Sequence, residues 1–288
     1  MALSIDPSSV RRYIERSLND LPALPSIVTK VLELSENPET SASELEEIIL
    51  ADQAITAKFL RVVNSAYYGL ATQVTSISHA VVILGFQQVR NIVLSMTAMS
   101  LLKARNKGTI NILHSFWRHS FGTGAAAIQL AKIKKIPAQQ RDLVHVGGIL
   151  HDIGQLFLFG NFTELYRLTL QLAATQSISI HEAEKKILGI TNAEVGGHLA
   201  QAWNFPKNLA DIIEFHHGPF DELPEHTIAI VHAADYLTKC SGNVLPSGID
   251  PMDEHVEQWL NLQPEEIPSL LVHISKKIKD AEEFFEIF

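Results

Sequence analysis

Residues 144–154 read Val-His-Val-Gly-Gly-Ile-Leu-His-Asp-Ile-Gly, and this stretch decides how the chain is interpreted. Apolar residues lead up to the adjacent pair His151 and Asp152, which places the pair inside a buried helical segment. An imidazole and a neighbouring carboxylate can both reach one metal ion, the imidazole as a borderline ligand and the carboxylate as a hard, bridging one. The pair alone is common, so it predicts a metal site only together with further ligands.

Further His and Asp residues flank the pair at separations that a helical fold can bridge. They are His119 before it, and His216, His217 and Asp235 after it. Asp235 lies in the otherwise apolar stretch 228–237, and an unpaired buried carboxylate costs several kcal/mol. Any single histidine more often has a structural role, but the whole set predicts a metal centre. The donor set favours one or two divalent Fe, Mn or Zn ions over Mg, which prefers oxygen ligands.

The overall composition is that of an ordinary globular protein, with 288 residues of which 46% are hydrophobic and 19% are charged. The net charge of −9 argues against a nucleic-acid partner, because such an interface needs a basic surface. Cys240 is the single cysteine, which excludes a disulfide within the chain and favours a reducing compartment. The first residues do not resemble a signal peptide, and the apolar stretch 91–102 is too short to cross a bilayer. We therefore expect a cytoplasmic protein without membrane contact.

Helical periodicity runs through nearly the whole chain, and no segment alternates in the manner of a β-strand. The expected helices begin at Pro7 and Ser26, follow the capping residues Ser41, Asp52 and Ser76, and then cover about 87–104, 111–132, 141–157, 162–175, 180–188, 192–203, 207–217, 226–240 and the tail 264–288. Residues 106–108, Asn-Lys-Gly, are the best candidate for a boundary. The prediction is an all-α, two-lobed helical bundle, with an N-terminal lobe at 1–106 and a C-terminal lobe at 107–288 that contains the metal centre.

Several stretches resemble the HDOD domain, a relative of the HD-domain metal phosphohydrolases found in bacterial signalling proteins. The resemblance extends from about Leu21 to Cys240 and rests on residues 21–25, 52–60, 64–69, 76–80, 84–85, 116–120, 147–154 and 203–206. The most specific part combines 52–60 with Asn64-Ser65-Ala66-Tyr67-Tyr68-Gly69, whose tyrosines either line an interaction surface or pack internally. The resemblance implies an HD-like C-terminal lobe and a signal-transduction module that acts mainly through contacts with signalling proteins.

The HD-phosphohydrolase pattern is a His, a His-Asp pair and a distant Asp, which match His119, His151, Asp152 and Asp235. The related HD-GYP cyclic-di-GMP phosphodiesterases add two adjacent histidines, which resemble His216-His217. His232 lies one helical turn before Asp235 and is either a residue that orients a ligand or an ordinary buried histidine.

The chain departs from the HD-GYP pattern at four places. It has Ser115 in place of a Glu, Gln155 in place of a Lys, Asn192 in place of a His, and Gly-Pro-Phe at 218–220 in place of Gly-Tyr-Pro. Metal-dependent attack on phosphorus needs two ions, or one ion and a cation that stabilises the developing charge, and Gln155 carries none. The departures favour a regulatory module with little or no catalysis. The intact His and Asp residues keep a metal-dependent phosphohydrolase or phosphodiesterase, acting on a small-molecule phosphodiester, as the alternative.

Overall fold

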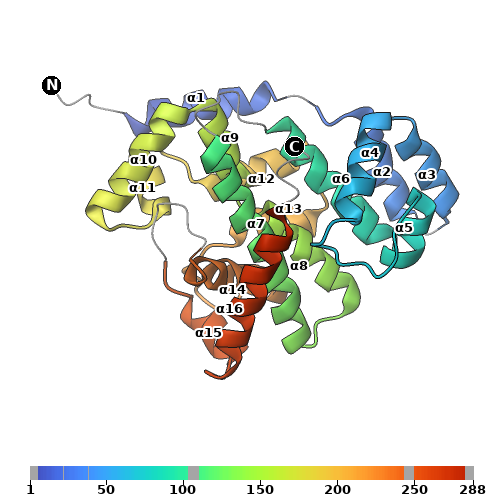
Figure 1. Cartoon of the computed structure of the whole chain (residues 1–288). Coiled ribbons are helices and arrows are strands. Elements are labelled where there is room, and N and C mark those ends of the chain that lie inside the picture. Colours follow the sequence, from blue (N-terminus) through green and yellow to red (C-terminus); the bar gives the residue numbers. More distant parts are fainter. Residues whose placement is uncertain (1–5, 22, 38, 103–109, 243–249, 283–288) are drawn as a thin grey trace.

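A computed structural model describes residues 6–21, 23–37, 39–102, 110–242 and 250–282 (Figure 1). These residues form α-helices without any β-strand, which confirms the predicted all-α class. The N-terminal part contains α1 (Pro7–Asn19), α2 (Ser26–Glu36), α3 (Ala42–Leu50), α4 (Gln53–Val63), α5 (Ile77–Leu84) and α6 (Phe86–Leu101). The C-terminal part contains α7 (Ile110–Ile133), α8 (Ala138–Leu150), α9 (Ile153–Asn161), α10 (Thr163–Gln176), α11 (Ile180–Ile187), α12 (Asn192–Ala202), α13 (Lys207–Phe215), α14 (His226–Cys240), α15 (Glu254–Leu260) and α16 (Glu266–Asp280).

Side-chain caps start several of these helices where the sequence predicted them. Ser41 and Glu44 form a complete capping box at α3, in which each side chain accepts a hydrogen bond from the other residue's backbone N–H. The Asp52 carboxylate accepts from the first backbone N–H groups of α4, and the Ser76 hydroxyl accepts from His79 at the start of α5. Local sequence chemistry therefore accounts for where these three helices begin.

Helix α7 runs through the middle of the C-terminal part and packs against α8, α14 and α16 (Figure 1). Helices α2 to α5 gather at one end of the molecule, and α6 connects them to α8. Helix α1 packs against α11, where the Arg11 guanidinium donates to the Gly189 carbonyl oxygen at 3.1 Å. The first helix thus contacts the C-terminal part of the chain. The proposed boundary at 106–108 lies outside the described residues.

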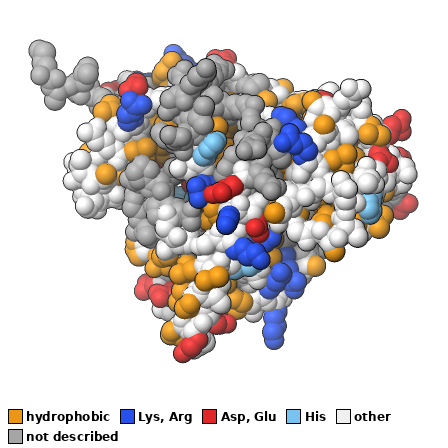
Figure 2. Space-filling model, viewed as in Figure 1, with side chains coloured by type: hydrophobic (Ala, Val, Ile, Leu, Met, Phe, Trp, Pro, Cys, Tyr) orange, Lys and Arg blue, Asp and Glu red, His pale blue; other side chains and the backbone are white. Residues whose placement is uncertain are grey.

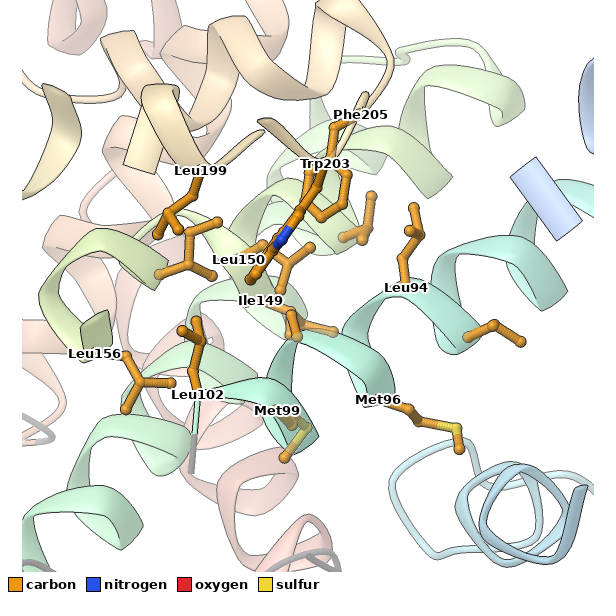
Figure 3. Packing of buried hydrophobic residues seen from close by; sticks show 14 of the residues in the cluster. Leu94, Met96, Met99, Leu102, Ile149, Leu150, Leu156, Leu199, Trp203 and Phe205 are labelled. Atoms are coloured by element: carbon orange, nitrogen blue, oxygen red, sulfur yellow. The ribbon is translucent and has the colours of Figure 1, made fainter. Parts of the chain in front are cut away.

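One buried hydrophobic cluster extends from the N-terminal helices into the C-terminal ones. Figure 3 shows its middle, where Leu94 and Leu102 at α6 face residues of α8, α9 and α12. Each large aliphatic side chain buried in such a core contributes about 1.5–3 kcal/mol. A second cluster fills the space between α7, α14, α15 and α16.

The sequence predicted one continuous helix over 141–157, but the structure divides it into α8 and α9 at His151 and Asp152. The His151 imidazole bonds to the Gly148 carbonyl oxygen at 2.8 Å, so a side chain competes for a carbonyl of the last helical turn. Further along, a Cβ atom on Gly154 would lie 1.9 Å from the carbonyl oxygen of Asn192, so only glycine permits this approach of α9 to α12. Helical periodicity in the sequence indicates that the segment is apolar, but it does not predict this interruption.

Within the described residues, the stretch Ala138–Asn161 is long and apolar enough to cross a membrane, but 89% of its apolar window is buried inside the protein. Helices α5 and α6 pass the same test only as a pair that bends by 119°. Core helices of globular proteins have this composition too, so the finding is weak evidence for membrane contact.

Candidate metal centre

Five of the six predicted ligands converge in the C-terminal part. His119 lies in the middle of α7, and His151 and Asp152 occupy the break between α8 and α9. His216 ends α13, and Asp235 lies on α14. All five residues are buried, with at most 5% of their surface exposed. Helix α7 reaches α8 closely because Gly124 faces Gly148, where a Cβ atom would lie 2.8 Å from the opposing backbone.

The ligand atoms form two overlapping groups that share His151. In the first group, His119 Nε2 lies 2.9 Å from Asp235 Oδ1 and 3.3 Å from His151 Nε2. In the second group, Asp152 places Oδ2 at 3.4 Å from His151 Nε2 and Oδ1 at 3.6 Å from His216 Nε2. Within each group the ligand atoms lie within 4.8 Å of one another, which is the spacing that one ion needs.

Backbone carbonyls set the tautomers of two of these histidines. His151 Nδ1 lies 2.8 Å from the Gly148 oxygen, and His216 Nδ1 lies 2.9 Å from the Ile213 oxygen. A carbonyl oxygen can only accept, so in each case Nδ1 carries the hydrogen and Nε2 faces the centre. Metal-binding histidines are oriented in this way.

The centre also contains polar atoms that the described residues leave unpaired. Asp152 Oδ1 and His216 Nε2 are buried and have no hydrogen-bond partner among those residues. Native proteins seldom leave such atoms unsatisfied, and an ion between them would satisfy both. Imidazole nitrogens mixed with carboxylate oxygens suit Fe, Mn or Zn, so the residues present fit a transition ion.

Charge is strongly coupled within the cluster. Burial alone would lower the pKa of His151, but Asp152 and Asp235 outweigh burial and raise that pKa to about 10. Burial would raise the pKa of Asp152, but His151 and His216 hold it well below its usual value. Burial lowers the pKa of His216 to about 4, so this imidazole is neutral at pH 7. Without an ion, the centre is therefore a protonated His151 between two carboxylates.

Lys239 is a residue of the centre that the sequence pattern did not predict. Its ammonium lies 2.7 Å from Asp235 Oδ2, and its side chain is 12% exposed. Burial would lower the pKa of Lys239, but the carboxylates of Asp235 and Asp152 raise it. The signal was present, because residues four apart on a helix share a face and Lys239 follows Asp235 by four.

His217 is the one predicted ligand that the structure does not bring into either group. Its ring packs between those of His216 and His181, with centroid distances of 3.7 and 3.6 Å. Burial holds the pKa of His217 well below its usual value. His181 comes from α11, and the sequence offered no pattern that links it to the His pair.

His232 supports the centre through the backbone. Its Nδ1 lies 2.9 Å from the His216 carbonyl oxygen, and its Nε2 accepts from the Asp253 backbone N–H at 3.0 Å. Both ring nitrogens are thus used, so His232 positions the residue that carries a ligand and is not itself a ligand.

The positions that depart from the HD-GYP pattern are occupied by uncharged side chains. Ser115 is exposed on α7, and Gln155 is buried on α9. The Asn192 amide donates to Glu184 Oε2 at 3.0 Å, and the Tyr166 hydroxyl donates to Oε1 of the same buried carboxylate at 3.0 Å. Asn192 therefore belongs to a buried hydrogen-bonded group with Glu184 and Tyr166.

Acidic and basic side chains both occur in the middle of the face shown in Figure 2, beside hydrophobic ones. That face does not present a surface of one charge.

Comparison with known proteins identifies the family. The sequence profile of the HDOD domain matches residues 21–219, more than two thirds of the chain. An uncharacterised protein of Treponema pallidum (strain Nichols) is 29% identical over 201 residues, which cover 70% of this chain and 38% of that protein. The chain thus corresponds to well under half of that relative.

Solved structures share the fold. An HDOD domain protein of unknown function from Geobacter sulfurreducens has a TM-score of 0.71 at 23% identity, with 98% of each chain covered. A proposed signal transduction protein from Marinobacter aquaeolei VT8 has a TM-score of 0.75 at 21% identity, covering 99% of this chain and 67% of its own. A proposed metal-dependent phosphohydrolase from Shewanella amazonensis SB2B has a TM-score of 0.61 at 23% identity, covering 94% of this chain and 99% of its own. At these identities the likeness concerns the fold alone, and it is the sequence match over residues 21–219 that shows that this chain belongs to the HDOD domain family.

Proposed function

We propose that the chain is a bacterial, cytoplasmic signal-transduction module that acts mainly through contacts with signalling proteins. Membership of the HDOD family supports this, and one structural neighbour is itself called a proposed signal transduction protein. The observation that carries the proposal is the environment of Gln155 and Asn192 in the structure. Gln155 is a buried neutral amide, and Asn192 is bound to Glu184, so neither supplies the cation or the imidazole of an HD-GYP centre.

The proposed module holds Fe, Mn or Zn in its His/Asp centre. His119, His151, Asp152, His216 and Asp235 would provide the ligands. A bound ion would supply Lewis acidity and additional binding energy to the fold. The protein residues themselves join α7, the α8–α9 break, α13 and α14 at one buried point. In this role the centre stabilises the shape that partner proteins recognise.

A metal-dependent phosphohydrolase is the second candidate, because the structure assembles the complete His, His-Asp and Asp set. Lys239 provides a cation near the centre, whereas Gln155 carries no charge. That ammonium is, however, already paired with Asp235, and the segment after the His pair is used in packing. The Phe220 backbone N–H donates to Asp253 at 2.9 Å, and the Phe220 ring packs on His232.

Two measurements test the proposal. Elemental analysis of protein purified without chelator should find a transition metal near one ion per chain. The metal-loaded protein, assayed with Mn and with Fe(II), should hydrolyse cyclic-di-GMP and a generic phosphodiester far more slowly than an ordinary enzyme. Losing one electrostatic contact to the transition state commonly costs about 100- to 1000-fold in rate.

Two results would contradict the proposal. Metal content well below one ion per chain would contradict the metal-binding part of the proposal. Turnover of about 1 per second or faster, abolished by Asp152→Ala, would replace the signalling module with the phosphohydrolase.

A further inference from the structure

Asp235 divides its two oxygens between different partners. Oδ1 faces the imidazoles, at 2.9 Å from His119 and 3.7 Å from His151. Oδ2 faces the Lys239 ammonium at 2.7 Å. The carboxylate is thus shared between the ligand cluster and a fixed positive charge from its own helix.

We propose that Lys239 is a built-in second cation of the centre, which restricts the centre to a single metal ion. This inference rests on the proposed metal binding and adds to it the number of ions and the residue that sets the number.

The geometry of Asp235 favours a single ion. A carboxylate that bridges two ions needs both of its oxygens, and Lys239 already occupies one oxygen of Asp235. Asp235 Oδ1, Asp152 Oδ1 and His216 Nε2 are all buried without a hydrogen-bond partner among the described residues. Asp235 Oδ1 faces the imidazoles, whereas Lys239 binds the other oxygen, Oδ2. Lys239 therefore leaves Asp235 one oxygen for an ion and prevents this carboxylate from bridging two.

The charge of the centre also favours a single ion. The centre contains two buried carboxylates, Asp152 and Asp235, so one divalent ion would neutralise it before Lys239 is counted. With Lys239 a single ion already leaves an excess of positive charge, and a second ion would add two more charges in a site of low dielectric constant. The other side chains near Lys239 include Asp250, His217 and His232, and Asp250 alone of these adds negative charge. The ammonium thus takes the electrostatic place of the second ion.

Cobalt(II) binding tests the inference directly. The full chain is stripped with chelator and titrated with Co(II), and bound ion per chain is measured by elemental analysis after dialysis, alongside the visible absorption of the Co(II) centre. The variants are Lys239→Met, which removes the charge, and Lys239→Gln, which also removes it but keeps a hydrogen-bond donor for Asp235 if the first variant folds poorly. Lys207→Met is the matched control, because Lys207 forms an exposed pair with Asp211 at the same spacing of four residues.

We expect one Co(II) per chain in the wild type and in Lys207→Met. The Lys239 variants should bind a second ion, or bind the first at least tenfold more tightly. Two ions per wild-type chain would overturn the inference while leaving the proposed metal binding intact. Unchanged stoichiometry and affinity in the Lys239 variants would overturn it as well. If the wild type binds none, the proposed metal role fails. A Lys239 variant that then gains an ion would support Lys239 as the competing cation, and one that gains none would overturn this inference too.

Discussion

His151 and His216 both contact Asp152, yet their pKa values move in opposite directions. His151 lies between two carboxylates, with Asp152 at 3.4 Å and Asp235 at 3.7 Å. Those charges overcome burial and raise its pKa to about 10. His216 meets one oxygen at 3.6 Å and faces the charged His151, so burial prevails and lowers its pKa to about 4. Neighbouring charges therefore decide the protonation of two equally buried rings.

Metal binding should therefore release a proton. In the metal-free protein His151 is protonated at pH 7, because its pKa is about 10. An ion needs the neutral imidazole, so each ion bound displaces about one proton and its apparent affinity should rise about tenfold per pH unit between pH 7 and 9. Calorimetric titration of Zn(II) in two buffers with different heats of ionisation measures this proton. An affinity that does not change with pH would show that His151 is not a ligand.

Loss of His151 should destabilise the fold. His151→Ala removes the partner shared by Asp152 and Asp235, and leaving buried charges unpaired costs about 3–5 kcal/mol. Glu222→Ala removes an exposed carboxylate and should change the free energy of unfolding by less than about 0.5 kcal/mol. Thermal unfolding followed by circular dichroism compares the two. Equal, small shifts in melting temperature would mean that the centre contributes little to stability.

The sequence could predict most of the centre because its ligands are chemically unusual in apolar segments. His119 and Asp235 stand out for that reason, and the adjacency of His151 and Asp152 is visible by eye. The role of Lys239 depends on which face of α14 is buried, and the meeting of His181 with His217 depends on how α11 packs. Such contacts follow from the tertiary arrangement, which local spacing does not contain.

At the scale of elements, the motif at 64–69 connects the two parts of the molecule. Tyr67 and Tyr68 pack internally, and the Tyr67 hydroxyl lies 2.8 Å from His145 Nε2 on α8 and 3.2 Å from the Phe121 carbonyl oxygen on α7. The Gln88 amide N–H on α6 donates to His145 Nδ1, so Nε2 carries the ring hydrogen and donates to Tyr67. Tyr67 can then donate to Phe121. Burial lowers the pKa of His145 to about 4, which keeps this neutral arrangement at pH 7.

Tyr67→Phe should weaken the contact between these elements. The change keeps the ring but removes the hydroxyl that His145 and the Phe121 oxygen both use, at a cost of about 1–3 kcal/mol. Tyr13→Phe is the control, because Tyr13 is 62% exposed and should change stability by less than about 0.5 kcal/mol. Urea unfolding gives both free energies. Equal free energies of unfolding for the two variants would show that the hydrogen-bonded chain through His145 does not stabilise the packing.

The caps and the apolar faces of the helices follow from local sequence, which is why α3, α4 and α5 begin where predicted. The break between α8 and α9 was not predicted, because helical periodicity does not show that the His151 side chain bonds to the Gly148 carbonyl oxygen. Helix α15 was also missed, since its seven residues are too few to show a helical period.

At the scale of the whole molecule, the predicted lobes share one core. The main hydrophobic cluster contains Ile14 and Phe59 from the N-terminal helices together with Leu150 and Trp203 from the C-terminal part. Helix α1 also packs on α11. A boundary near 106–108 can separate two groups of helices in sequence without separating two units of stability.

Unfolding should therefore be a single cooperative transition. All three tryptophans, Trp117, Trp203 and Trp259, lie in the C-terminal part, so their fluorescence reports on that part. Phe59 is fully buried on α4, and Phe59→Ala should cost about 3–5 kcal/mol through the cavity that it leaves. If the core is shared, this N-terminal change must shift the tryptophan transition and the circular dichroism transition by the same amount.

Val82→Ala is the control for that experiment, because Val82 is 80% exposed on α5 and its loss should move neither transition appreciably. Two separate transitions in Phe59→Ala, with the tryptophan signal unchanged from wild type, would show that 1–106 and 107–288 unfold independently. Coincident shifts would instead mean that a disturbance of α4 reaches the helices that carry the His/Asp centre. A signalling module requires such coupling, since a partner that binds the N-terminal helices can influence the centre only through packing that both parts share.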